Sequence, residues 1–257
     1  SAQVSTTSSY GEAVTADNNG NTFQAVVYKG SISFGSHTVN AASLTTYAYA
    51  YAIVKFNSEG DAQWVVNAGS GIGNISGMAA DNNGNLFITG WFSGSITFGS
   101  TTLTSAGALD MFVVKLNNSR QWVWAKSFGG TGEAKGGGID ADSVGNVYIN
   151  GTFRSMTIGS TVLTSVGLDD LFVMKLDSSG NFLWVSKVGG IGNEYIQPTG
   201  NNLAVDSVGN SYVVGEAGVD PVTVNGTTLT GSGGADLLIA KFDSSGAAIW
   251  GARAGST

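Results

Sequence analysis

The segment "GGGIDADSVGNVYINGTF" (residues 136–153), together with "DDLFVMKLDSSGNFLWVSKVGG" (residues 169–190), decides the fold. Aromatic and β-branched residues fill four short runs in these stretches, and Gly, Asn, Asp and Ser separate the runs, which is typical of strands joined by tight turns. In the second run, Val147 and Ile149 alternate with Tyr148, which is the period-two pattern of a β-strand. The segment therefore predicts four antiparallel strands and no helix.

This segment is one of four copies of a repeat. A tryptophan recurs at intervals of 60, 60 and 66 residues, and a lysine lies nine residues before each one: Trp64, Trp124, Trp184 and Trp250, with Lys55, Lys115, Lys175 and Lys241. An aspartate recurs at intervals of 64, 61 and 64: Asp17, Asp81, Asp142 and Asp206. A fixed period is the signature of a repeat architecture. We therefore divide the chain, as a single domain over residues 1–257, into an N-terminal extension and four units: residues 1–10, about 11–70, 71–131, 132–190 and 191–257.

Four antiparallel strands per unit, apolar on both faces, are typical of a propeller blade, because each blade is covered by a neighbour on either side. We expect an all-β protein: a β-propeller of four four-stranded blades. A small extra hairpin is predicted between the second and third strands of each unit, as in "TIGSTVLTSVG" at residues 157–167.

How the ring closes is left open by the sequence. Each unit supplies all four of its own strands, and none remains to fasten the last blade to the first. We favour a closed ring over an open or assembled form. An open ring would leave two faces of the buried type exposed, and it would self-associate through its end blades as a dimeric ring or a filament.

The repeat resembles the bacterial β-propeller repeats of the SBBP family. The shared elements are the Asp-x-x-Gly-Asn turn, the aromatic-rich second strand, the Asp-x-Phe-Val-x-Lys-Leu strand and the last strand with its tryptophan. The resemblance covers almost the whole chain, from about residue 11 to residue 255. It implies a propeller of secreted or surface proteins. It implies no single activity, because the family has no common catalytic motif and a fold alone does not define a function.

Composition narrows the functional classes. Only 11% of the residues are charged, the net charge is −7, and cysteine is absent. An acidic surface disfavours nucleic-acid binding, and no apolar run is long enough for membrane insertion. The absence of cysteine excludes disulfides and thiolate chemistry. The small polar start "SAQVSTTSSY" is like the first residues after a removed signal peptide, so we expect a secreted or cell-surface protein.

Candidate binding residues lie where the units differ. The turns that join strands one to two and three to four are short and uniform, whereas the connections on the opposite face are long and varied. Binding usually sits on variable loops of a fixed scaffold, so the aromatic and acidic departures there predict a ligand or partner patch. Its members are Tyr47, Tyr49, Tyr51, Trp91, Glu194, Tyr195 and Asp220. The alternative is that these residues adjust the packing of the ring or vary neutrally.

The repeated motifs have structural interpretations beside the functional ones. The "DNNGN" and "DSVGN" loops offer one carboxylate each, too few for a calcium site, and the glycine and asparagine favour a hairpin turn. The repeated lysines and tryptophans are expected to pair and pack within the sheet. His37, as the single histidine, has no partner for a metal site. We predict no catalytic residue, no metal and no cofactor.

Three functions remain in order of preference. The first is a non-catalytic propeller, secreted or on the cell surface, that acts in protein interaction, adhesion or extracellular structure and can self-assemble. The second is a lectin that binds surface glycans through Trp91, the tyrosine cluster and Tyr195. The third is an extracellular hydrolase that uses acidic loop residues such as Glu194, Glu216 and Asp220.

Overall fold

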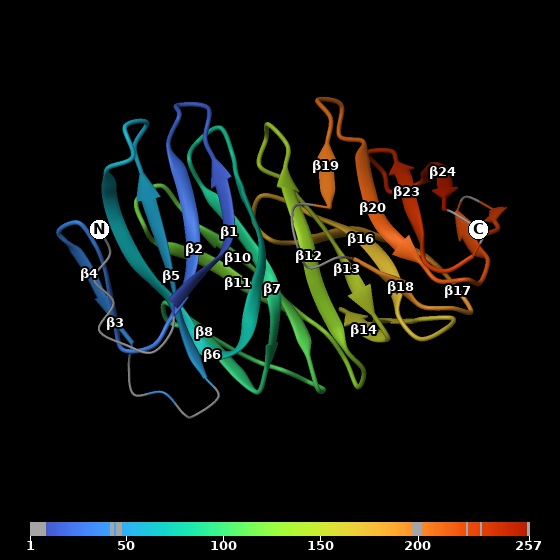
Figure 1. Ribbon diagram of the computed structural model, residues 1–257, viewed down its shortest axis with the longest axis horizontal. Coiled ribbons are helices and arrows are strands. Elements are labelled where there is room, and N and C mark those ends of the chain that lie inside the picture. Colours follow the sequence, from blue (N-terminus) through green and yellow to red (C-terminus); the bar gives the residue numbers. More distant parts are fainter. Residues whose placement is uncertain are drawn as a thin grey trace.

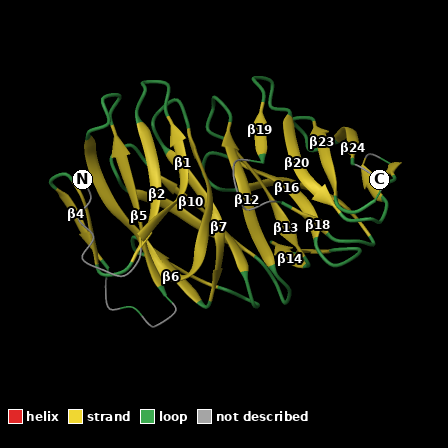
Figure 2. Ribbon diagram, viewed as in Figure 1, coloured by secondary structure: helices red, strands yellow, loops and turns green. Residues whose placement is uncertain are grey.

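The computed structural model describes residues 9–41, 44, 48–196, 202–224, 226–231 and 233–255. These residues form strands and turns, with no helix among them, so the predicted all-β class is confirmed (Figure 2). The units follow one another along the longest axis of the molecule, with the first unit (blue) at one end and the fourth (red) at the other (Figure 1).

The first two units share one continuous sheet of seven antiparallel strands, in the order β1-β2-β5-β6-β7-β10-β11. The bounds are β1 (Ser9–Ala16), β2 (Thr22–Tyr28), β5 (Tyr49–Phe56), β6 (Ala62–Ala80), β7 (Leu86–Ser93), β10 (Asp110–Leu116) and β11 (Trp122–Phe128). The strand β6 has 19 residues. Its first half is the last strand of the first unit, and its second half is the first strand of the second unit.

The third and fourth units have the same strand order. The third unit contains β12 (Ala134–Ala141), β13 (Val147–Phe153), β16 (Asp170–Leu176) and β17 (Phe182–Gly190). In the fourth unit, two short strands, β18 (Glu194–Tyr195) and β19 (Leu203–Val205), both pair with β20 (Ser211–Ala217), which is followed by β23 (Asp236–Phe242) and β24 (Ala248–Ala254).

The extra hairpin predicted for each unit is confirmed. The four hairpins are β3–β4 (Ser31–Phe34, His37–Asn40), β8–β9 (Ser95–Phe98, Thr101–Thr104), β14–β15 (Ser155–Ile158, Thr161–Thr164) and β21–β22 (Val222–Val224, Thr227–Leu229). From the second unit onward, each hairpin contacts the last strand of the unit before it. Gly129 bridges to Thr157, and β17 pairs with β21 through Gly189 and Gly190. The hairpins therefore link consecutive units.

The units pack face to face, as the two-sided apolar pattern predicted. Every junction contains a cluster of buried apolar side chains from both neighbours. At the first junction, Phe23 and Ile53 of the first unit meet Ile88 and Phe112 of the second. The second and third units are therefore covered on both faces, by the unit before and the unit after.

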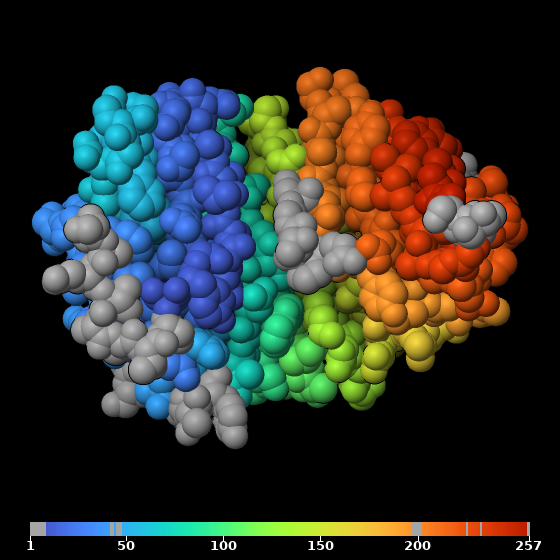
Figure 3. All heavy atoms as spheres, in the orientation of Figure 1, coloured from blue at the N-terminus to red at the C-terminus, as the bar shows by residue number. Residues whose placement is uncertain are grey.

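The closed ring that we favoured from the sequence is not found. Among the described residues, no strand of the first unit pairs with a strand of the fourth. In space-filling view the first and fourth units lie at opposite ends of the row, with the second and third between them (Figure 3). The two end faces therefore do not cover each other.

Candidate functional site at the inner strands

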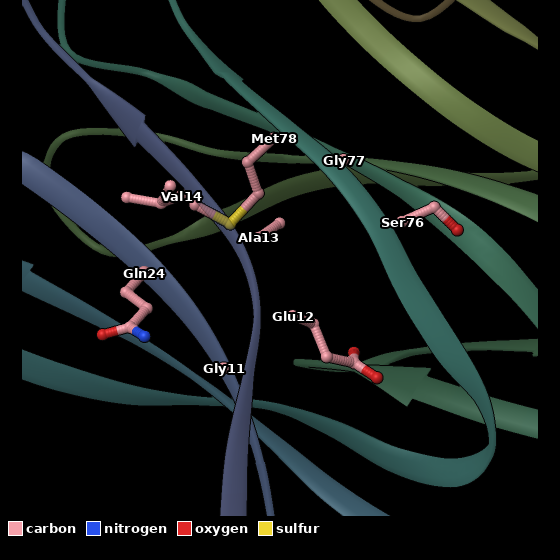
Figure 4. A pocket seen from close by; sticks show the side chains of 8 residues that line it. All are labelled: Gly11, Glu12, Ala13, Val14, Gln24, Ser76, Gly77 and Met78. Atoms are coloured by element: carbon pink, nitrogen blue, oxygen red, sulfur yellow. The ribbon is translucent and has the colours of Figure 1, made fainter. Parts of the chain in front are cut away.

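The first strands of the units, β1, the second half of β6, β12 and β19, lie next to one another in the row. A pocket of about 390 Å³ opens between β1 and β6. Figure 4 shows its lining, which is Gly11, Glu12, Ala13, Val14, Gln24, Ser76, Gly77 and Met78. The pocket combines an apolar wall with one carboxyl group, one amide and one hydroxyl.

Glu12 reaches this pocket because it lies in a β-bulge of β1, between Gly11 and Ala13. A bulge redirects the side chain of the extra residue, and bulges are frequent beside binding sites. The carboxylate of Glu12 crosses to the second unit, where it accepts hydrogen bonds from Asn74 Nδ2 at 2.6 Å and from the Ile75 N–H at 2.7 Å. Burial raises the pKa of Glu12 to about 7, and these two hydrogen bonds oppose the rise. Glu12 therefore changes its protonation near neutral pH.

A group of tyrosines lies close to Glu12. The rings of Tyr10 and Tyr49 meet edge to face with centroids 6.3 Å apart, and Lys29 Nζ lies 4.4 Å from the centroid of Tyr49. Tyr51 is 1% exposed. Burial raises the pKa of Tyr51, and the nearby Glu12 charge adds to this effect. The cluster is thus a mixed aromatic and acidic surface beside the pocket.

The structure separates the residues that we predicted to form one patch. Tyr49 and Tyr51 belong to the first unit, and Tyr47 lies outside the described residues. Trp91 lies on β7, half-buried, opposite Asn74 and Met111 in the sheet.

The other predicted residues are at the far end of the row, in the fourth unit. Tyr195 is 44% exposed, whereas Glu194 is completely buried and accepts a hydrogen bond from the Gly190 N–H. The backbone oxygen of Asp220 accepts a hydrogen bond from Arg253 Nη1 at 2.6 Å. The described members of the predicted patch therefore lie in different units, and two of them, Tyr51 and Glu194, are buried.

The aspartate of each Asp-x-x-Gly-Asn loop is used by the loop itself. In the first loop, Asp17 Oδ1 accepts the N–H groups of Asn19 and Asn21, and Asp17 Oδ2 accepts Asn21 Nδ2 at 2.7 Å. The loops of Asp81, Asp142 and Asp206 repeat all three bonds. The described residues hold no group of three or more metal-ligating side chains. The geometry is that of a hydrogen-bonded turn.

The repeated lysines have a partner that the sequence analysis did not identify. Each one lies over the aromatic ring of the second strand of its own unit, 4.6 to 5.2 Å from the ring centroid: Lys55 with Phe23, Lys115 with Phe87, Lys175 with Tyr148 and Lys241 with Tyr212. The available signal was the aromatic residue that follows each Gly-Asn turn by two positions. These cation–π contacts belong to the scaffold of the unit.

A second candidate surface is the outward face of the fourth unit. Val214 and Leu237 are 37% and 50% exposed there. The equivalent residues of the third unit, Asn150 and Leu171, are 0% and 2% exposed, because the fourth unit covers them. Trp250 on β24, which is 40% exposed and lies opposite Lys241 in the sheet, extends the same exposed surface. In the fourth unit, the face that the other units bury against their neighbour is thus exposed.

The fold and these surfaces define a class, a repeat protein of four-stranded β-units stacked face to face, as in β-propellers. Residues 184–221 match the SBBP family model, described as a β-propeller repeat, which confirms the predicted resemblance for this part of the chain. The matched segment begins in β17 and ends just before β21, so the family repeat crosses from the third unit into the fourth.

A curated relative is the "Uncharacterized WD repeat-containing protein L264" of Acanthamoeba polyphaga mimivirus. It is 27% identical over 114 residues, which are 41% of this chain and 8% of the relative. The chain thus spans a small part of that protein, whose name records repeats and no activity. Within the described residues, the structure has no helix with the length and apolar character needed to cross a membrane.

Proposed function

We propose that the chain is a non-catalytic interaction propeller, secreted or on the cell surface, with its four units as four blades. The observation that carries this proposal is the outward face of the fourth unit, where Val214, Leu237 and Trp250 are exposed. Contiguous exposed apolar residues on a soluble protein mark an interaction surface. The propeller family and the WD-repeat relative support the same class of function, because such scaffolds commonly bind other proteins.

The occupant of this face is a second copy of the chain. The equivalent face of every preceding unit receives another β-unit of the same repeat, so the surface is shaped for a partner of this kind. The hairpin of the first unit covers part of its outer face, where Val26 and Ala52 are 5% and 0% exposed. Because the hairpin of the first unit covers this part of its outer face, we expect two fourth units to meet about a two-fold axis, which closes the assembly at a dimer.

Charge supports this arrangement. Lys241 lies opposite Tyr212 at one end of the exposed face, and Glu216 lies opposite Leu237 at the other end. A two-fold axis that lies in the plane of the interface, perpendicular to the strands, makes the strands of the two copies run in opposite directions. It therefore places the lysine of each copy beside the glutamate of its partner, which adds orientation to an apolar contact.

Light scattering after size exclusion, over a range of concentrations, tests the proposal. We expect a dimer for the wild type and a monomer for Leu237→Glu. The matched control is Val123→Glu, which places the same charge at a residue 52% exposed on β11 of the second unit and should remain dimeric. A monomeric wild type at every concentration, or a dimer that Leu237→Glu leaves intact, would overturn the proposal.

A further inference from the structure

A second groove lies between the first and second units, at their short turns. Its volume is about 580 Å³, and its lining is mostly polar. The residues that matter here are Asn21, Lys55, Gln63, Trp64, Asn118 and Arg120. None of them belongs to the inner pocket or to the exposed face of the fourth unit, so this groove is independent of the proposed function.

Arg120 has an unusual backbone conformation. Its φ is 66°, and it is the single non-glycine residue with positive φ in the described part of the chain. The other units carry Gly60, Gly180 and Gly246 at this turn position, with φ of 86°, 79° and 87°. A side chain is strained in the left-handed region. Strain of this kind gathers at functional sites, so Arg120 points to a role outside folding.

In the third and fourth units, the glycine of this turn packs against a tryptophan of the preceding unit. A Cβ atom on Gly180 would lie 2.9 Å from the ring of Trp124, so the turn of the third unit sits directly on that indole. Trp124 Nε1 also donates a hydrogen bond to the backbone oxygen of Ser178 in the same turn. At the next junction, Trp184 Nε1 donates in the same way to Ser244, at 3.0 Å.

At the first junction this packing is missing. Arg120 carries the Cβ that would collide with an indole, so the turn cannot sit on Trp64 as the glycine turns sit on Trp124 and Trp184. Among the described residues, Trp64 Nε1 makes no hydrogen bond to the turn. The groove is the result, with the indole of Trp64 as one wall.

The groove also gathers positive charge on an acidic protein. Neither Lys55 nor Arg120 forms an ion pair with a carboxylate of the described residues. Lys115, at the same position of the next unit, donates instead to the backbone oxygen of Ser178. Asp17 is the acid whose charge interacts with Lys55, and both of its oxygens are engaged in its own turn. No carboxylate in the described part of the chain neutralises either cation at close range, so both can attract an anion from solution, Lys55 from its place over the ring of Phe23.

We propose that this groove binds an acidic saccharide, with one sugar ring on Trp64 and its carboxylate or sulfate between Lys55 and Arg120. The C–H groups of a pyranose face carry partial positive charge, which attracts the negative face of an indole. The guanidinium of Arg120 suits a planar or multi-oxygen anion, and the amides of Asn21, Gln63 and Asn118 both donate to and accept from hydroxyls. The net charge of −7 disfavours long polyanions and limits the site to a short segment of sugar chain.

Calorimetry with three probes tests the ligand class. The probes are an oligogalacturonate, which carries carboxylates, a heparin-derived oligosaccharide, which carries sulfates, and a methyl-esterified oligogalacturonate as the neutral match of the first. We expect binding of one or both acidic probes, none of the neutral one, and a shift of the Trp64 indole N–H signal in NMR. The two acidic arms show which anionic group the site prefers. Binding of no acidic probe, or equal binding of the neutral one, would overturn the proposal.

Arg120→Gly is the decisive variant, because it restores the glycine of the other three turns and should fold normally. We expect the affinity for the acidic probe to fall by about tenfold or more, as for the loss of a charge-assisted bidentate contact. Lys55→Met should weaken binding similarly. Lys126→Met changes the net charge equally at an exposed residue outside the groove, and should leave binding unchanged. Unchanged binding by Arg120→Gly, or an equal loss with Lys126→Met, would contradict the site.

Discussion

The carboxyl groups of Asp170 and Glu194 are buried together at the junction between the third and fourth units. Both residues are 0% exposed. Burial raises the pKa of Glu194 to about 7; the hydrogen bond from the Gly190 N–H opposes the rise, and the charge of Asp170 adds to it. Lys187 Nζ lies 3.7 Å from Asp170 Oδ2 and partly balances the pair. The preceding junction has Ala134 in place of Glu194, so the acid is not needed for the packing.

This pair predicts a stability that falls between about pH 4.5 and pH 7. Glu194 in the folded protein holds its proton up to about pH 7, whereas in the unfolded chain it ionises near its ordinary 4.5. The folded state therefore binds more protons in this window, and raising the pH favours unfolding. At about 1.4 kcal/mol for each pH unit, the contribution of Glu194 to this loss is at most about 3.5 kcal/mol. Urea unfolding at several pH values should show a smaller loss in Glu194→Gln than in the wild type, because Glu12, whose pKa is also raised to about 7, contributes its own loss in both proteins. Parallel curves for the two proteins would contradict it.

The strands of each unit could be predicted from the sequence because their determinants are local. Period-two alternation, aromatic and β-branched residues, and Asp-x-x-Gly-Asn turns recur in all four units, and the structure has strands and turns where these patterns fall. Closure of the ring could not be predicted in this way. It depends on small rotations between units that add up over the whole row, and no single residue encodes them.

Asp110 and Gly129 supply a second prediction, about packing inside the second unit. Asp110 Oδ2 accepts a hydrogen bond from the Ala106 N–H at 2.9 Å, and a Cβ on Gly129 would lie 2.0 Å from the carboxyl carbon of Asp110. We expect Gly129→Ala to destabilise the protein by about 1–3 kcal/mol, as overpacking does.

The double variant Asp110→Ala/Gly129→Ala provides the control for that clash. Asp110→Ala alone should also destabilise, by about 1–3 kcal/mol, because the Ala106 and Gly107 N–H groups lose the buried carboxylate that accepts their hydrogen bonds. If the two side chains compete for one space, the double variant loses less than the two single variants together. Strict additivity in thermal or urea unfolding would show that the glycine is required for another reason.

The candidate sites were harder to predict than the strands, because exposure depends on the neighbouring unit. Tyr49 and Tyr51 alternate with alanines, and the alternation continues through Ile53, which is the pattern of a strand that faces the core. The acid of the inner pocket, Glu12, was missed because the other units have Ser76 and Gly137 at that place, and the β-bulge that directs it is not visible in a hydrophobic pattern.

Arg120 yields a prediction about stability that is separate from ligand binding. Glycine adopts positive φ without strain, whereas an arginine at φ 66° does not. We expect Arg120→Gly to stabilise the protein by about 0.5–1 kcal/mol. This figure is the strain that glycine relieves in the folded state, minus the cost of the greater flexibility that glycine gives the unfolded chain. Gly180→Ala, at φ 79° and against Trp124, should do the opposite. If the unfolding midpoints of Arg120→Gly and Gly180→Ala both fell below that of the wild type, the arginine itself would be shown to support the fold.

The turn aspartates give the last prediction, which separates a hydrogen-bonded turn from a calcium loop. Asp142 accepts two backbone N–H groups and Asn146 Nδ2, and Asp142 Oδ2 lies 3.9 Å from Lys175 Nζ. We expect Asp142→Ala to cost about 1–3 kcal/mol, because these donors lose their acceptor. Calcium should leave the melting temperature of the wild type unchanged.

Asp177 is the matched comparison for Asp142. It makes the same three bonds within its own turn, to the Ser179 and Asn181 N–H groups and to Asn181 Nδ2. Asn181 is exposed, however, whereas Asn146 is half-buried, and Lys126 acts on Asp177 without forming an ion pair within 4.0 Å. Asp177→Ala should therefore cost less than Asp142→Ala, since water replaces lost hydrogen bonds more readily at an exposed turn. A melting temperature that rises with calcium in the wild type and not in Asp142→Ala would instead identify the loop as an ion site, because a ligand that binds only the folded state raises its stability.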